Sequence, residues 1–264
     1  MQYFTLSNKI TIPVTGSGTN SFAKVNKEYT GDTKEVRSAV KAGYRFFDTA
    51  EGYRNEEAIG KGIAESGIDR KEFFLCTKMS KREERPMTRE DVQEALQRSL
   101  QKLNTEYIDL YLLHFPREDM EETAELWKGF EEAYTKGYVR SIGICNFSRE
   151  QLSYLLDHCV IPPMVLQVKC NPEEWNSEVI RYAKVHGILP MAWGPLRFAP
   201  EYREPLTAIG TKYGKTWAQV ILRYHYQNGV ISIPKSHSYE HQVQNLDIFD
   251  FELNDQEMKQ IAEL

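Results

Sequence analysis

The chain alternates short apolar runs with amphipathic helical segments from about Val14 to its end. Eight of the runs have the character of strands: Val14–Gly18, Phe46–Asp48, Phe73–Thr77, Ile108–Leu113, Val139–Ile144, Val165–Lys169, Leu189–Ala192 and Val230–Ile233. Strands that alternate with helices form parallel βαβ units, whose strands read as continuous apolar runs because both faces are buried. Eight such units in 264 residues predict an α/β fold, the (β/α)8 TIM barrel. An open doubly wound sheet is the competing architecture.

Amphipathic segments fill the intervals between the predicted strands. In Arg89–Leu103, apolar residues recur four positions apart and charged residues occupy the other face. The other predicted helices are Lys34–Ala42, Glu56–Ser66, Glu121–Lys136, Arg149–Leu156, Glu178–His186 and Trp217–Gln227. The ends of the chain add an N-terminal β-hairpin (Tyr3–Leu6 and Lys9–Thr11), expected to close the barrel bottom, and two extra C-terminal helices (Ser238–Ile248 and Asn254–Leu264). No linker divides the chain, so we expect a single domain over residues 1–264.

Charge and cysteine usage limit the partners and the compartment. The balance of 33 basic and 38 acidic residues, without a basic tract, argues against binding to nucleic acid or to an anionic membrane. The four cysteines form no C-x-x-C pair, the N-terminal residues do not resemble a signal peptide, and no apolar run reaches the ~20 residues that span a bilayer. We therefore expect a cytoplasmic protein that is a monomer or a weak homo-oligomer.

Reactive side chains stand at the ends of three successive predicted strands. Asp48 ends the second, Lys78 follows the third and His114 follows the fourth, while Tyr53 lies in the short loop after Asp48. Each residue alone has an ordinary structural explanation as a loop or core residue. Active sites of TIM barrels, however, lie at the C-terminal ends of the strands, and the joint placement of the four at one rim favours catalysis.

These four residues suit general acid catalysis at a carbonyl. A tyrosine phenol has a pKa of about 10, and a neighbouring ammonium such as that of Lys78 is expected to lower it. Asp48 would keep Lys78 charged and oriented, and His114 would hold the carbonyl oxygen. The set offers no activated nucleophile, and no metal is expected, so a hydride must come from a bound cofactor.

Two other functions remain open from these residues. Lys78 could form a Schiff base in a lyase on the same barrel, although Asp48 beside it would keep the amine protonated. The protein could also be a sensor that binds a nucleotide with little turnover. The glycine-rich run at residues 15–20 lacks the third glycine of a Rossmann fingerprint and is a weak signal.

Five segments resemble the aldo-keto reductases, in the same order and over nearly the whole chain: RFFDTAEGYRNEEAIGKGI, FLCTKM, YIDLYLLHFP, SIGICNFS and IPKSHSYEHQVQNLDIFDFEL. The resemblance implies an oxidoreductase that reduces aldehydes or ketones to alcohols by hydride transfer from NADPH, with NADH possible as the donor. It also implies that Asp48, Tyr53, Lys78 and His114 are the catalytic tetrad. The run A-W-G-P-L is similar to that of bacterial 2,5-diketogluconate reductase-like members.

The resemblance also implies where the cofactor and the substrate bind. The cofactor residues are Asn146 and Gln167 for the carboxamide, Trp193 for nicotinamide stacking, the backbone of Gly194, Pro195 and Leu196 for the pyrophosphate, Lys235 and Ser236 for the 2′-phosphate, and Asn245 for adenine. The substrate would contact His114, Asn20 and Phe115, in an open pocket that suits small or varied aldehydes, ketones and keto-sugars.

Two departures from the family pattern concern the cofactor. His241 stands where an arginine usually grips the 2′-phosphate, and neutral histidine cannot replace that bidentate contact. Cys145 stands where the family commonly has serine, so one carboxamide hydrogen bond is expected to be weaker or absent. Because of His241, we expect a reduced margin of NADPH over NADH, although Lys235 and Ser236 still favour NADPH.

Overall fold

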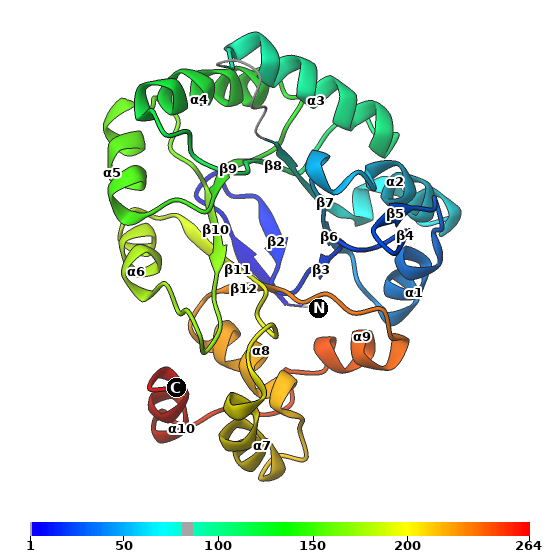
Figure 1. Cartoon of the computed structure of the whole chain (residues 1–264), viewed down its shortest axis with the longest axis vertical. Helices are drawn as coiled ribbons and strands as arrows, with labels where there is room; N and C mark the ends of the chain where they lie inside the picture. The colour runs from blue at the N-terminus through cyan, green and yellow to red at the C-terminus, as the bar shows by residue number, and fades with distance from the viewer. Residues whose placement is uncertain (1, 81–86) are drawn as a thin grey trace.

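The structure, a computed structural model, describes residues 2–80 and 87–264 and contains one closed parallel sheet (Figure 1). Its strands are β3 (Ser17–Gly18), β6 (Phe46–Asp48), β7 (Phe74–Met79), β8 (Leu110–Leu113), β9 (Ile142–Cys145), β10 (Val165–Lys169), β11 (Leu189–Trp193) and β12 (Ile231–Ile233). Each pairs in parallel with its neighbour, in the order β12-β11-β10-β9-β8-β7-β6-β3. A parallel bridge from Thr15 to Ser232 joins the two edges, so the barrel prediction is confirmed and the open sheet is wrong.

Helices surround this barrel: α1 (Lys34–Ala42), α2 (Glu56–Glu65), α3 (Arg89–Leu103), α4 (Met120–Thr135), α5 (Arg149–His158), α6 (Ser177–Val185), α8 (Trp217–Gln227) and α9 (Tyr239–Leu246). Because α9 packs against α1, it completes the ring of helices. The last helix, α10 (Asp255–Ala262), begins after Asn254, whose side chain accepts a hydrogen bond from the backbone N–H of Glu257 and so caps the helix. Both predicted C-terminal helices are therefore present.

A further helix and a second hairpin were not predicted. Helix α7 (Arg203–Thr211) follows the short 3₁₀ turn η3 (Pro200–Tyr202) and packs against α8. Its buried residues are few, so it lacks a long amphipathic repeat. The strands β4 (Lys24–Val25) and β5 (Glu28–Tyr29) form a second hairpin, whose turn residues have positive φ angles. Both α7 and this hairpin follow barrel strands in the chain and belong to the connections between strand and helix.

The N-terminal hairpin lies at the opposite end of the barrel from the carboxyl ends of the strands. It consists of β1 (Tyr3–Thr5) and β2 (Thr11–Pro13), which pair antiparallel. In its turn, the Nδ2 of Asn8 donates a hydrogen bond of 2.9 Å to the carbonyl of Arg140, shortly before β9 begins. The prediction that this hairpin covers the barrel bottom is confirmed.

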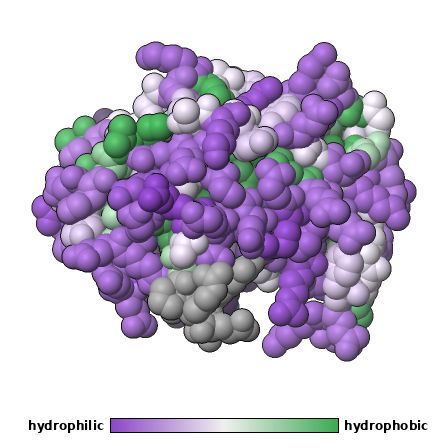
Figure 2. Space-filling model, turned by 90° about the horizontal axis from the view of Figure 1, so that it is seen from above, coloured by the Kyte–Doolittle hydropathy of each residue, from purple (hydrophilic) through white to green (hydrophobic). Residues whose placement is uncertain are grey.

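The surface in the view of Figure 2 is mostly hydrophilic, with small apolar patches scattered over it. This is what helices produce when they pack an apolar stripe against the barrel and turn charged residues outward. Within residues 2–80 and 87–264, no helix is both long and apolar enough to cross a bilayer.

Candidate active site

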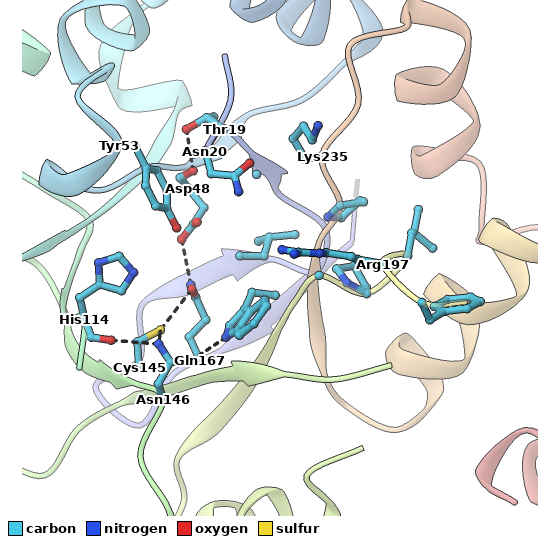
Figure 3. A pocket seen from close by; sticks show the side chains of 18 of the residues that line it. Thr19, Asn20, Asp48, Tyr53, His114, Cys145, Asn146, Gln167, Arg197 and Lys235 are labelled. Atoms are coloured by element: carbon cyan, nitrogen blue, oxygen red, sulfur yellow. Dashed lines mark hydrogen bonds between the residues drawn. The ribbon is translucent and has the colours of Figure 1, made fainter. Parts of the chain in front are cut away.

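The predicted tetrad meets at the carboxyl ends of the strands, beside a cavity of about 650 Å³. Asp48 is the last residue of β6, and Lys78 lies near the end of the neighbouring strand β7. His114 directly follows β8, and Tyr53 ends the 3₁₀ turn η1 (Glu51–Tyr53). Asp48, Tyr53 and His114 line the cavity, as Figure 3 shows for these labelled residues.

Lys78 is fully buried, and its ammonium has two acceptors. It donates a hydrogen bond of 2.6 Å to the Oδ2 of Asp48 and one of 2.8 Å to the backbone carbonyl of Thr49. Burial is the largest single influence and disfavours the ammonium, but Asp48, together with smaller contributions from Tyr53, Cys76 and Cys145, outweighs it and raises the pKa of Lys78. Lys78 is therefore charged at neutral pH and held in one position.

Tyr53 presents its ring to both Lys78 and His114. The Lys78 Nζ lies 5.0 Å from the centre of the Tyr53 ring, and the rings of Tyr53 and His114 meet edge to face with centres 5.8 Å apart. Burial raises the pKa of Tyr53 and the charge of Lys78 opposes it, with the result that the pKa stays above its usual value. Lys78 lowers the pKa of Tyr53, as expected. The prediction that this pKa falls below its ordinary value is wrong, because burial has the larger effect. The phenol is fully protonated near neutral pH.

His114 is neutral at physiological pH. Burial, assisted by the charge of Lys78, lowers its pKa to about 3. A neutral imidazole carries one N–H donor, which can be directed to a carbonyl oxygen without adding a second cation beside Lys78.

A buried polar network holds the loop that carries Tyr53, and the sequence did not predict it. Asn55 donates a hydrogen bond of 2.6 Å to the carbonyl of Thr19 and accepts one of 2.9 Å from the Oγ1 of Thr49. Thr19 in turn donates its hydroxyl to the carbonyl of Asp48 at 2.9 Å. The ends of β3 and β6 and the start of α2 are therefore fixed relative to Asp48.

The residues assigned to the nicotinamide end lie together next to the tetrad (Figure 3). Gln167 donates a hydrogen bond of 2.8 Å to the Oδ1 of Asp48. Asn146 accepts one of 2.8 Å from the indole N–H of Trp193 and donates one of 3.0 Å to the carbonyl of His114. The buried Cys145 donates its thiol to the Oε1 of Gln167 at 3.5 Å. All four residues line the cavity.

The residues assigned to the phosphates are only partly in the cavity. Gly194, Pro195, Leu196 and Lys235 line it, whereas Ser236, His241 and Asn245 do not. His241 is exposed on α9, and the hydroxyl of Ser236 donates to the carbonyl of Ser238. Asn245 is buried and forms a side-chain hydrogen bond with Tyr44.

The two residues assigned to the substrate both line the cavity. Asn20 follows β3, and its backbone carbonyl accepts a hydrogen bond from Lys24 at 2.9 Å. Phe115 remains 45% exposed and stacks on His114 with ring centres 4.6 Å apart. The cavity wall thus includes the apolar ring of Phe115 and the side-chain amide of Asn20.

Sequence reasoning missed several residues of the cavity wall, above all Arg197, Phe198 and Arg203. They lie in and just after the loop that follows β11, which the A-W-G-P-L run already identified up to Leu196. Arg197 could have been predicted, because it is a cation that directly follows the residues assigned to the pyrophosphate.

Comparisons with known proteins show which family the chain resembles in sequence and in structure. The model of the aldo/keto reductase family matches residues 15–264. Glyoxal reductase of Bacillus subtilis is 39% identical, over 98% of this chain and 91% of that protein, and methylglyoxal reductase DkgA of Escherichia coli K12 is 35% identical, over 87% and 82%. An aldo/keto reductase from Brucella melitensis has a similar structure, with a TM-score of 0.90 and 35% identity over 99% of this chain and 98% of that one. The Bombyx mori enzyme AKR2E4, solved in complex with NADP, has a TM-score of 0.91 and 34% identity over 99% and 92%.

Proposed function

Since the chain belongs to the aldo/keto reductase family, we propose that it uses NADPH to reduce small aldehydes and ketones to alcohols, with Tyr53 as the proton donor. The observation that carries the proposal is the placement of the Tyr53 phenol beside the buried Lys78–Asp48 pair, at the wall of a cavity large enough for a ligand.

The residues present fit a nicotinamide dinucleotide. Side-chain amides of Asn146 and Gln167 and the Trp193 indole lie at the tetrad, while the cations Arg197 and Lys235 line the same cavity. A dinucleotide needs an amide-binding and aromatic end, and positive charge for its phosphates. When bound, NADPH supplies the hydride.

The protein side chains supply the proton and its control. Tyr53 donates its phenolic proton to the carbonyl oxygen, and the neutral His114 donates a hydrogen bond to the same oxygen. The positive charge of Lys78 stabilises the phenolate that forms, and Asp48 keeps that charge in place. Because Lys78 lowers the pKa of Tyr53 against the effect of burial, its charge matters most as the phenol loses its proton.

The Schiff-base lyase is disfavoured by the state of Lys78. A lysine attacks a carbonyl as a neutral amine, whereas Asp48 raises the pKa of Lys78, and the ammonium is fully buried. Lys78 also does not line the cavity in which a substrate would bind.

We propose small 2-oxoaldehydes as good substrates. The support comes from the relatives named glyoxal reductase and methylglyoxal reductase, and from Asn20, whose amide can donate to the second oxygen of a dicarbonyl. The partner is thus a small carbonyl compound, and we place the enzyme in the cytoplasm as a monomer or weak homo-oligomer.

The test is oxidation of NADPH, followed at its absorbance band, with a panel of glyoxal, methylglyoxal, a keto-sugar and a steroid ketone. We expect turnover of glyoxal, methylglyoxal and the keto-sugar, the highest kcat/KM for the dicarbonyls, and poor turnover of the steroid ketone. Bound NADPH without oxidation by any compound would instead support the sensor. A protein–substrate adduct trapped on Lys78 by borohydride would support the lyase.

A further inference from the structure

Asn55 is the N-cap residue of α2, yet its side chain does not cap that helix. Asparagine is among the best N-caps, because its side-chain oxygen can accept from a backbone N–H of the first turn. Here the side chain is fully buried and makes tertiary contacts instead. Its Nδ2 donates to the carbonyls of Thr19 at 2.6 Å and Phe22 at 3.2 Å, and its Oδ1 accepts from the hydroxyl of Thr49 at 2.9 Å. Thr19 lies beside Asp48 in Figure 3, so these contacts reach the tetrad.

Thr49 connects Asn55 to the catalytic lysine. Its hydroxyl donates to Asn55, and its backbone carbonyl is the second acceptor of the Lys78 ammonium, at 2.8 Å. The first acceptor is the Oδ2 of Asp48, at 2.6 Å. Because Asp48 and Thr49 are consecutive, one short segment at the end of β6 supplies both acceptors, and Asn55 holds the second residue of that segment.

Glu56, the first residue of α2, holds the strand that carries Lys78. Its Oε1 accepts from the hydroxyl of Thr77 at 2.7 Å, and both residues are buried. Thr77 directly precedes Lys78 in β7. The start of α2 is therefore bonded to the strand of the lysine through Glu56 and to the acceptor of the lysine through Asn55. It fixes the two relative to each other.

The orientation of the Lys78 ammonium decides what its remaining N–H can reach. An ammonium has three N–H donors, so two fixed acceptors leave one direction for the third. The nearby catalytic group is Tyr53, with its ring centre 5.0 Å from Nζ. Burial has the largest effect on the pKa of Tyr53 and raises it, whereas the charge of Lys78 and a side-chain hydrogen bond with Lys78 lower it. A displaced Thr49 carbonyl would let the ammonium rotate and would weaken that hydrogen bond.

We propose that Asn55 and Thr49 are positioning residues for proton transfer, because they hold the Thr49 carbonyl against Lys78 and so keep the third N–H of its ammonium directed at the Tyr53 phenol. The inference rests on the proposed function, since it needs Tyr53 as the proton donor. Neither Asn55 nor Thr49 lines the cavity, so both act through Lys78 and not through a contact with the substrate.

The test breaks the bond between Asn55 and Thr49 and leaves the backbone carbonyl in place. Thr49→Val removes only the hydroxyl function. We expect kcat for the reduction of methylglyoxal to fall by about tenfold, because a misdirected proton donor costs rate. The Kd for NADPH, from fluorescence titration, should be unchanged.

The pH profile of Thr49→Val separates positioning from a purely structural role. With a weaker bond to Lys78, the pKa of Tyr53 should rise further, so the fall of kcat/KM in alkali should move to higher pH. The other titratable groups that act on Tyr53 are Asp48 and Cys145, which both raise its pKa and are unchanged in the variant. The facing ring of His114 is neutral in this range.

Thr33→Val is the matched control. Thr33 is also buried, and its hydroxyl donates to Glu65 at the other end of α2. Its loss should lower the free energy of unfolding, measured with urea, about as much as Thr49→Val does, and should leave kcat and the alkaline limb unchanged. Thr49→Ser keeps the hydroxyl and should recover both quantities.

The outcomes separate the inference from the proposed function. If Thr49→Val loses stability and keeps its kcat, the bond serves the fold alone and the inference is overturned. A lower kcat with an unmoved alkaline limb, or equal losses in Thr49→Ser, would overturn it as well. Should Thr49→Val not fold, Thr49→Ala removes the same hydroxyl with a smaller side chain and is judged by the same criteria. Near-normal reduction by Tyr53→Phe would instead refute the proposed proton donor.

Discussion

Asp48 accepts a hydrogen bond of 2.6 Å from Lys78, and this pair lies beneath the cavity with the carboxylate 2% and the ammonium 0% exposed at their side chains. A buried pair is costly to break because the remaining charge has neither water nor a partner. Since Asp48 also accepts from Gln167, it connects the proton donor's lysine to the proposed carboxamide site.

The first prediction concerns this pair. Asp48→Asn leaves the Lys78 ammonium buried without a counter-charge, so we expect the free energy of unfolding to fall by about 3–5 kcal/mol. The pKa of Lys78 should also fall because burial is then opposed less. Urea denaturation followed by circular dichroism measures the loss of stability. Asp247→Asn is the control. Asp247 pairs with Lys215, but its side chain is 57% exposed, so its loss should lower the free energy of unfolding by less than about 1 kcal/mol.

The second prediction concerns the proton donor. Tyr53→Phe keeps the ring that contacts His114 and removes only the hydroxyl. We expect kcat for reduction to fall by about 10²- to 10⁴-fold while the Kd for NADPH is unchanged. Stopped-flow turnover and fluorescence titration measure the two quantities, and Tyr138→Phe, on the surface, is the control. Near-normal reduction by Tyr53→Phe would refute the assignment.

The third prediction concerns pH. The pKa of His114 is lowered to about 3 and that of Tyr53 is raised, so neither group changes charge between about pH 5 and about pH 8. We expect kcat/KM for carbonyl reduction to be flat across that range and to fall only when alkali deprotonates Tyr53. A titration limb near pH 6.5 that disappears in His114→Gln would contradict the neutral state of His114.

Much of this architecture follows from patterns along the chain, and its remainder depends on contacts between distant segments. Eight apolar runs were enough to predict the barrel, whereas α7 has too few buried positions to give a helical repeat that can be recognised in the sequence. The strand ends brought Asp48, Lys78 and His114 together because parallel strands share one rim. The role of Asn55 could not be predicted in this way, since Thr19 and Thr49 come within hydrogen-bonding distance of it only in the folded barrel.

The pKa of Tyr53 illustrates the same limit. The sequence indicated that Lys78 would lie near the phenol and would lower its pKa, and this direction is correct. The size of the opposing effect depends on how deeply the phenol is buried by the surrounding loops. Burial depth is a property of the assembled site and has no local pattern in the chain.

The fourth prediction concerns a buried histidine outside the active site. His225 is 1% exposed, bonds to Ser232, and has its pKa lowered by burial to about 3. The unfolded chain, with a histidine pKa of about 6.5, therefore binds one more proton than the folded protein between these values, and stability rises with pH there. This contribution is complete above about pH 6.5 and is lost as pH falls toward 3. In His225→Gln, the slope of unfolding free energy against pH should decrease by about 1.4 kcal/mol per pH unit between about pH 4 and about pH 6. An unchanged slope in denaturant titrations at several pH values would show that His225 binds protons equally in the folded and unfolded states, and would contradict the lowered pKa.

The fifth prediction concerns cofactor preference. His241 is exposed on α9, where the family usually has an arginine, and the cation that lines the cavity nearby in sequence is Lys235. His241→Arg adds a fork that can grip a 2′-phosphate, so we expect NADPH to bind about tenfold tighter, corresponding to ~1.4 kcal/mol, and NADH to bind as before. Parallel titrations with both nucleotides measure the ratio, and Gln244→Arg, on the same helix, controls for added charge alone. If His241→Arg tightens NADPH and NADH equally, position 241 does not face the 2′-phosphate, because only that group distinguishes the two nucleotides.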